Sequence, residues 1–256
     1  MTGLLRSEWI KTTSTKGWWI LFVIGILLTV LSVLPVLLLS ELSSDLGSAP
    51  IEGVGLADPM VMQMMWGTMG SAQLIALIIG ILSFTGEYRH GTITDTFLTE
   101  PRRERVIMAK AGVSAVMAVI LAAITSVTVI VLAVLLLPGD HAPIDWPYVV
   151  RVAASVALAY ALYAVLGVAL GALITNQVVA IVLALLWVLM IESLIVGLKP
   201  EVGKWLPGGA SQSILSGMTA TGDELLPPAL GVVVLIGYTV VFAALAARTT
   251  LRRDIT

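Results

Sequence analysis

The chain has 256 residues, of which 58% are hydrophobic and only 12% are charged, and its formal net charge is −2. So few charged side chains cannot cover the surface of a soluble protein, and so apolar a chain is not intrinsically disordered either, so we expect an integral membrane protein. The slightly acidic balance argues against nucleic acid as a partner, and the absence of cysteine excludes disulfides, thiol catalysis and cysteine-ligated metal centres.

Residues 1–17 are too polar to cross a membrane. Met1, Leu5 and Trp9 recur at every fourth position, and polar residues lie between them. This spacing predicts a short helix that lies in the membrane interface. The alternative is an unstructured basic leader.

Six apolar stretches are each long enough to cross a bilayer core, which needs about 20 residues of helix. Their unbroken apolar character favours helices over the alternating strands of a barrel. We therefore predict an all-α integral membrane protein with a single transmembrane domain over residues 1–256. The predicted spans cover approximately residues 18–39, 60–84, 106–137, 149–174, 178–198 and 229–247.

The distribution of basic residues predicts the orientation. Of the 14 Lys and Arg residues, only Arg151, Lys199 and Lys204 fall on one side of the six spans. Because positive charge accumulates on the cytoplasmic side, we expect both termini and the loop of residues 85–105 to be cytoplasmic.

The loop of residues 85–105 carries signals for a short helix of its own. Gly91 can end the preceding helix in a left-handed conformation, Thr92 or Thr94 can cap a new helix, and Pro101 stops it. About two turns remain, and we expect them to expose three apolar side chains that suit a partner's groove: Ile93, Phe97 and Leu98. The alternative is a linker helix that packs on its own bundle.

Span four and the loop after span five also carry packing signals. Gly167 and Gly171 form a G-x-x-x-G pair, which predicts close helix packing within the chain, with a subunit interface as the alternative. Residues 199–228 contain several Pro and Gly breakers around a fairly apolar segment at 210–218. We expect this segment to form a short helix that re-enters the membrane before span six.

Glu192 is the one ionisable side chain deep within a span, where a carboxylate is costly unless it is paired or protonated. A tight hairpin about Asn176 brings Tyr160 or Tyr163 opposite it as a hydrogen-bond donor. A structural tie, a gating role and proton coupling all stay open for Glu192. Gln73 in span two is predicted at a different depth, where it bonds another helix or lines a pathway.

Three groups of residues carry a resemblance to a known family. G-E-Y-R-H-G-T-I at residues 86–93, followed by P-R-R-x-R at 101–105 and A-K at 109–110, resembles the loop between spans two and three of type-two ABC exporter permeases. Residues 5–11 resemble the N-terminal interfacial helix of that family. Residues 187–192, 199–200 and 205–210 resemble its fifth span and last external loop, especially in actinobacterial members.

The resemblance implies a permease subunit in a bacterial plasma membrane, paired with a second copy or a paralogue and with two cytosolic ABC ATPase subunits. The implied cargo is lipophilic or amphiphilic: a drug, antibiotic, peptide or lipid. The short helix of residues 92–99 would couple ATPase movement to the spans. The candidate coupling residues are Glu87, Arg89, Gly91, Thr92, Ile93, Asp95, Phe97, Leu98, Arg102 and Arg103.

In the family, spans two and five line the pathway. The candidate pathway or intramembrane polar residues are Gln73 of span two, Glu192 of span five, and the possible partners of Glu192 in span four, Tyr160 and Tyr163. The chain contains no G-x-x-x-x-G-K-[ST] phosphate loop. We therefore expect no catalytic residue, metal site or cofactor in this chain, with ATP and Mg bound by the partner ATPase. The alternative functions are an ion-coupled secondary transporter that uses Glu192 without an ATPase, and a membrane scaffold.

Overall fold

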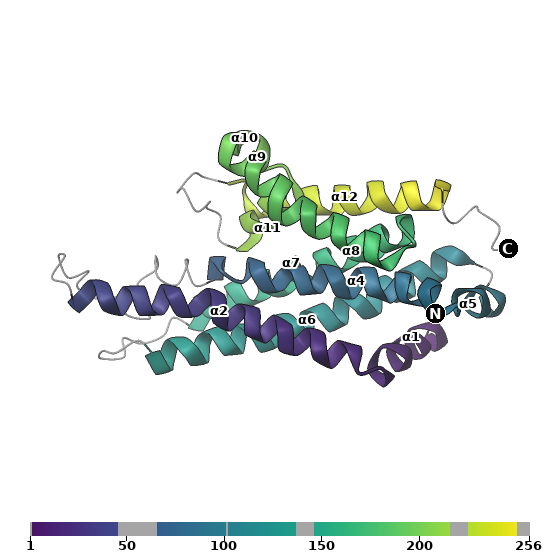
Figure 1. The fold of residues 1–256 in the computed structure, drawn as a ribbon, viewed down its shortest axis with the longest axis horizontal. Helices are drawn as coiled ribbons and strands as arrows, with labels where there is room; N and C mark the ends of the chain where they lie inside the picture. The colour runs from purple at the N-terminus through teal and green to yellow at the C-terminus, as the bar shows by residue number, and fades with distance from the viewer. Residues whose placement is uncertain (1, 46–65, 101, 137–145, 216–224, 250–256) are drawn as a thin grey trace.

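The computed structural model describes residues 2–45, 66–100, 102–136, 146–215 and 225–249, and these residues contain helices and no strand (Figure 1). The elements in chain order are α1 (Thr2–Ser14), α2 (Gly17–Asp45), α4 (Gly70–His90), α5 (Ile93–Thr99), α6 (Arg103–Leu136), α7 (Trp146–Leu173), α8 (Gln177–Leu186), the π-helical segment η1 (Trp187–Glu192), α9 (Ser193–Leu198), α10 (Pro200–Gly203), α11 (Pro207–Leu215) and α12 (Pro228–Thr249).

Six helices of the described chain are long and apolar enough to cross a membrane. Five are α2, α4, α6, α7 and α12, and the sixth is the continuous run of α8, η1 and α9 over Gln177–Leu198. The predicted all-α integral membrane fold with six spans is therefore confirmed. Residues 60–65, predicted to begin span two, lie outside the described residues.

The centre of the bundle is the contact between α4 and α7. A Cβ atom added to Gly80 would lie 2.0 Å from the carbonyl oxygen of Ala164, and one added to Gly167 would lie 2.2 Å from that of Leu77. The two helix backbones therefore touch where only glycine fits, and α6 packs on both helices. The predicted within-chain packing of the G-x-x-x-G pair is confirmed.

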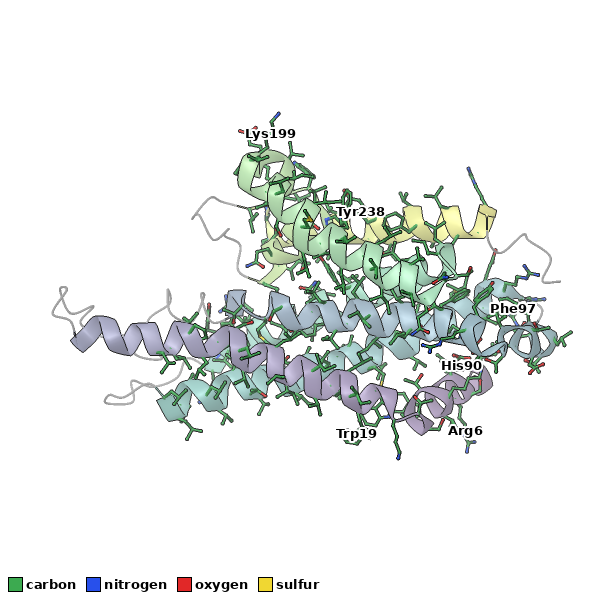
Figure 2. All side chains as sticks on the ribbon, viewed as in Figure 1. Arg6, Trp19, His90, Phe97, Lys199 and Tyr238 are labelled. Atoms are coloured by element: carbon green, nitrogen blue, oxygen red, sulfur yellow. The ribbon has the colours of Figure 1, made fainter. Side chains whose placement is uncertain are left out.

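The fifth and sixth spans are the least buried of the six. The fifth span packs on α4 and the sixth on α7, on the side of these two helices away from α2 and α6 (Figure 1). Their exposed side chains are mostly large and apolar. Figure 2 shows exposed side chains along the other helices too, among them Trp19 on α2 and Arg6 on α1. Lipid or another subunit must therefore cover the sides of this chain.

The helices α1 and α5 lie at the same end of the bundle as the last turns of α12 (Figure 1). This arrangement follows from six spans, because the segment before span one, the loop after span two and the end of span six must then lie on the same side of the membrane. The predicted interfacial segment at residues 1–17 is helical over Thr2–Ser14. Trp9 and Ile10 of this helix are exposed whereas Glu8 is buried, so α1 turns a charged side chain toward the protein.

Candidate functional site

The junction between α4 and α5 is built as the sequence predicts at Gly91. Gly91 has a φ of 71°, a left-handed conformation that costs a glycine little. The amide of Thr92 donates to the carbonyl oxygen of Glu87 at 3.0 Å, which closes the end of α4. Thr92 is the N-cap residue of α5, as one of the two predicted alternatives has it, although its side chain makes no capping hydrogen bond, and Thr94 lies inside the helix.

Only one of the three apolar side chains that we expected α5 to expose is exposed. Leu98 is 75% exposed, whereas Ile93 is buried. Phe97 packs against a cluster that includes Phe84, and the guanidinium of Arg103 lies 5.1 Å from its ring centre. The prediction is therefore wrong for Ile93 and Phe97. Their spacing of four residues places both on one face of α5, which packs on the bundle, and Leu98 points elsewhere.

The other candidate coupling residues divide in the same way. Glu87 is buried and Arg103 is half-buried over Phe97. The remaining ones are exposed together with Leu98, and we call this set the exposed α5 surface: Arg89, Gly91, Thr92, Asp95, Leu98 and Arg102. The surface thus presents one large apolar side chain, Leu98, among polar and charged ones.

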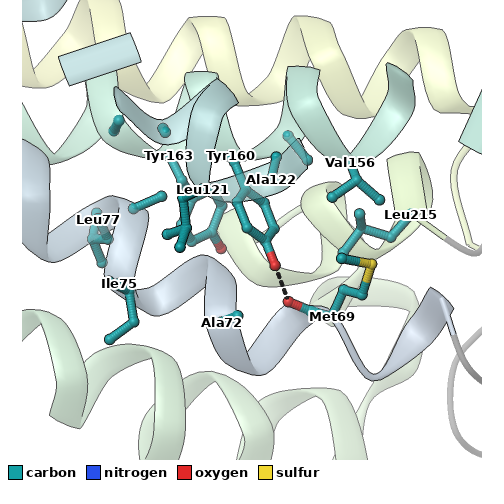
Figure 3. Packing of buried hydrophobic residues seen from close by; sticks show 14 of the residues in the cluster. Met69, Ala72, Ile75, Leu77, Leu121, Ala122, Val156, Tyr160, Tyr163 and Leu215 are labelled. Carbon is teal, nitrogen blue, oxygen red and sulfur yellow. Dashed lines mark hydrogen bonds between the residues drawn. The ribbon is translucent and has the colours of Figure 1, made fainter. Parts of the chain in front are cut away.

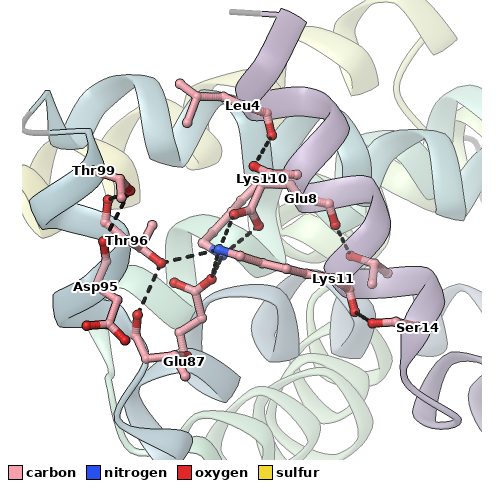
Figure 4. A network of polar contacts seen from close by, with 12 residues as sticks. Leu4, Glu8, Lys11, Ser14, Glu87, Asp95, Thr96, Thr99 and Lys110 are labelled. Carbon is pink, nitrogen blue, oxygen red and sulfur yellow. Dashed lines mark hydrogen bonds and ion pairs between the residues drawn. The ribbon is translucent and has the colours of Figure 1, made fainter.

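Behind α5, four charged side chains from three helices form a cluster that we call the charge cluster: Glu8 and Lys11 of α1, Glu87 of α4 and Lys110 of α6 (Figure 4). The amine of Lys110 lies 2.7 Å from Glu8 Oε2 and 2.8 Å from Glu87 Oε1. The amine of Lys11 lies 2.9 Å from Glu8 Oε1 and 2.8 Å from Glu87 Oε1. Two positive and two negative charges therefore compensate one another.

The charge cluster also holds α5. Lys11 Nζ donates a hydrogen bond of 3.2 Å to Thr96 Oγ1, on the buried face of α5. Burial disfavours the charged form of Lys11, but its hydrogen bonds to Glu8 and Glu87 outweigh burial and raise its pKa above the ordinary 10.5. Lys11 is therefore positively charged near neutral pH and connects α5 with α1 and α4.

Sequence reasoning did not place Glu8, Lys11, Thr96 or Lys110 in the site. Glu8 and Lys110 are 102 residues apart, and no local pattern pairs them. One signal was available, since Lys110 is a charge just inside the apolar stretch of span three and has to find a buried counter-ion.

The tyrosine expected beside Glu192 has another partner. The hydroxyl of Tyr160 is buried and donates to the carbonyl oxygen of Met69 at 2.8 Å (Figure 3). The prediction that Tyr160 bonds Glu192 is therefore wrong, because α7 turns this side chain toward the start of α4. Tyr163 is buried one turn further along α7.

Gln73 and Glu192 both contact the short helix α11. Gln73 Oε1 accepts a hydrogen bond of 2.6 Å from the hydroxyl of Ser211. The carboxylate of Glu192 accepts from the backbone amides of Gly208 and Gly209. We predicted different depths for the two side chains, but α11 brings their contacts within one helical turn, between Gly208 and Ser211. The described residues contain no group of three or more acidic or histidine side chains that could hold a metal ion.

Comparison with known proteins places this architecture in a family. Residues 4–191, which run from α1 to the π-helical segment of span five, match the family model described as ABC-2 family transporter protein. No curated protein matches the chain. The family match covers well over half of the chain and includes α5, the charge cluster and the first four spans. The chain therefore belongs to the ABC-2 family and is a multi-pass membrane subunit, the permease, of an ABC transporter.

Proposed function

We propose that this permease is an exporter subunit whose α5 is the coupling helix gripped by a cytosolic ATPase. The observation that carries the proposal is the division of α5 into two faces. One face is fixed to the bundle through Ile93, Thr96 and Phe97, and the other presents Leu98 at 75% exposure. A short helix that is fixed behind and open in front suits the transfer of force from a partner.

The charge cluster supports this role by joining α5 to more than one span. A displacement of α5 reaches α1 through Thr96 and Lys11, and it reaches α4 and α6 through Glu87 and Lys110. Because Glu8, Glu87 and Lys110 are buried, separating them from one another is costly, and the ends of these helices move as one unit. We infer that the ATPase stroke is shared by α1, α4 and α6.

The rest of the assembly follows from the family and from the chain's surface. Two ATPase subunits would hold ATP and Mg, because this sequence has no phosphate loop, and a second permease copy or a paralogue would complete the pathway. The few buried polar groups near the pathway, chiefly Gln73 and Glu192, suit a lipophilic or amphiphilic cargo. By the positive-inside rule, α1, α5 and both termini would face the cytoplasm, and the family resemblance implies a bacterial plasma membrane.

The proposal is tested by copurification of the permease with its ATPase. Leu98→Asp removes the exposed apolar contact and should abolish ATPase association, whereas Leu98→Met should retain it. Phe97 is the matched comparison, since Phe97→Asp should instead destabilise the permease itself. ATPase association that survives Leu98→Asp would contradict the coupling role. Transport of substrate across the membrane of liposomes that contain the permease without any ATPase would favour the ion-coupled alternative based on Glu192.

A further inference from the structure

The helix α11 is a buried nine-residue element at the part of the bundle away from α1 and α5 (Figure 1). Most of its side chains are buried, including Ala210, Ser211 and Ser213. It packs closely on the last span, because a Cβ atom added to Gly231 would lie 2.5 Å from the carbonyl oxygen of Ala210. Two buried polar side chains, Glu192 of η1 and Gln73 of α4, also hold α11.

The first anchor of α11 is Glu192. This residue ends the π-helical segment η1, and such segments are rare and often occur at functional sites. Its carboxylate meets the amides of Gly208 and Gly209 in the first turn of α11, where the helix dipole favours negative charge. A Cβ atom on Gly208 would lie 2.8 Å from Glu192 Oε1, so glycine makes room for the carboxylate.

The second anchor is Gln73 on α4. Its Oε1 accepts a hydrogen bond from the hydroxyl of Ser211, and the two oxygens are 2.6 Å apart. Ser211 lies three residues beyond Gly208. The two anchors come from the second and the fifth spans, and they hold the same short helix from its first turn to its second.

Each anchor leaves one buried polar atom without a partner among the described residues. These atoms are Glu192 Oε2 and Gln73 Nε2. A buried polar atom without a hydrogen bond destabilises the state that contains it, and contact with water relieves that penalty. The packed position of α11 therefore carries a penalty that its release would remove.

We propose that Glu192 and Gln73 are positioning residues that hold α11 against spans five and two, and that α11 can detach from these spans. In the packed state both anchors are made. In the released state α11 separates from α4, η1 and α12, so that water reaches the two anchors and the face that carries Ser213. This inference goes beyond the coupling role of α5 and does not depend on the ATPase.

Thiol labelling tests the proposal on the full-length permease in detergent solution. The sequence has no cysteine, so Ser213→Cys places a single thiol on the fully buried face of α11. A maleimide should label it slowly in the parent chain. Adding Glu192→Ala or Gln73→Ala should speed labelling, by about tenfold or more for Glu192→Ala, which removes two hydrogen bonds. Adding Glu192→Gln should leave it slow, because the amide oxygen still accepts from Gly208 and Gly209.

A second thiol separates release of α11 from loss of the whole fold. Ser114→Cys lies buried in α6, and its labelling should stay slow in the Glu192→Ala background. Equal labelling of Ser213→Cys with and without Glu192→Ala overturns the proposal, and so does fast labelling of both thiols in that background. Because no ATPase is present, failure here leaves the coupling role untouched, and failure of ATPase copurification leaves this inference untouched.

Discussion

Lys110 is the most deeply buried member of the charge cluster, and replacing it tests whether the cluster holds the coupling end together. Lys110 is 1% exposed and pairs with two carboxylates, at 2.7 Å and 2.8 Å. Lys110→Met keeps a side chain of similar length but removes the positive charge. Glu8 and Glu87 then share only Lys11, whose side chain is 46% exposed.

The expected cost follows from the geometry. Removing one partner of a buried ion pair costs about 3–5 kcal/mol, because the remaining charge stays buried without compensation. Lys11 still contacts both carboxylates, so we expect the lower end, about 3 kcal/mol. The double variant Lys110→Met with Glu87→Gln restores neutrality with Glu8 and Lys11, and it should recover at least about 1 kcal/mol of that loss.

Thermal unfolding of the purified permease in detergent measures both variants. A loss of 3 kcal/mol corresponds to a Tm lower by about 6–12 °C for a chain of this size. Glu87→Gln alone completes the double-mutant cycle. A Lys110→Met chain as stable as the parent, or a double variant no more stable than Lys110→Met, would refute the view that these charges compensate one another.

Three further variants test other parts of the account. Lys11→Met should cost less than Lys110→Met, because Lys11 is partly exposed and the more deeply buried Lys110 still pairs with both carboxylates, yet transport per ATP should fall while Lys11→Arg retains it. The pKa of Lys11 in the folded protein is raised above 10.5. Its contribution to the stability of the fold should therefore be constant below about pH 10 and disappear as the pH rises through the folded pKa. The difference in Tm between the parent and Lys11→Met, measured as a function of pH, tests this. Gly91→Ala should lower stability by about 1 kcal/mol because φ is 71°, and unchanged Tm and ATPase binding would contradict the role of that turn. Gly167→Ala should disrupt folding, because its Cβ atom would lie 2.2 Å from the Leu77 carbonyl oxygen, and size-exclusion chromatography should then show aggregation. The control Gly3→Ala on α1 should be neutral, because its Cβ atom meets no atom within 4 Å.

The sequence predicts those features that depend on local pattern. Apolar length is sufficient for the six spans, and the need for a positive φ marks Gly91. The small residues of α7 indicate close helix packing, because a helix without side chains at these positions lets a neighbouring backbone approach. Gly167 does so at the Leu77 carbonyl oxygen of α4. Breakers around residues 210–218 indicate a short helix, and α11 forms over Pro207–Leu215.

The contacts that organise the site depend on tertiary packing, which one sequence does not display. Helical spacing groups Ile93 with Phe97, but it does not say whether that face meets the bundle or a partner. Counting residues along each span places Gln73 and Glu192 at different depths in the membrane. The count does not include α11, the third helix, which contacts both side chains. The pairing of Glu8 with Lys110 likewise depends on how α1 lies against α6.

The central claim is that a separate ATPase grips the exposed face of α5, and copurification of that ATPase with Leu98 variants measures it most directly. The account predicts that the parent chain and Leu98→Met retain the ATPase in equal amounts, and that Leu98→Asp loses it while keeping the parent Tm. Full retention of the ATPase by a folded Leu98→Asp chain would contradict the account.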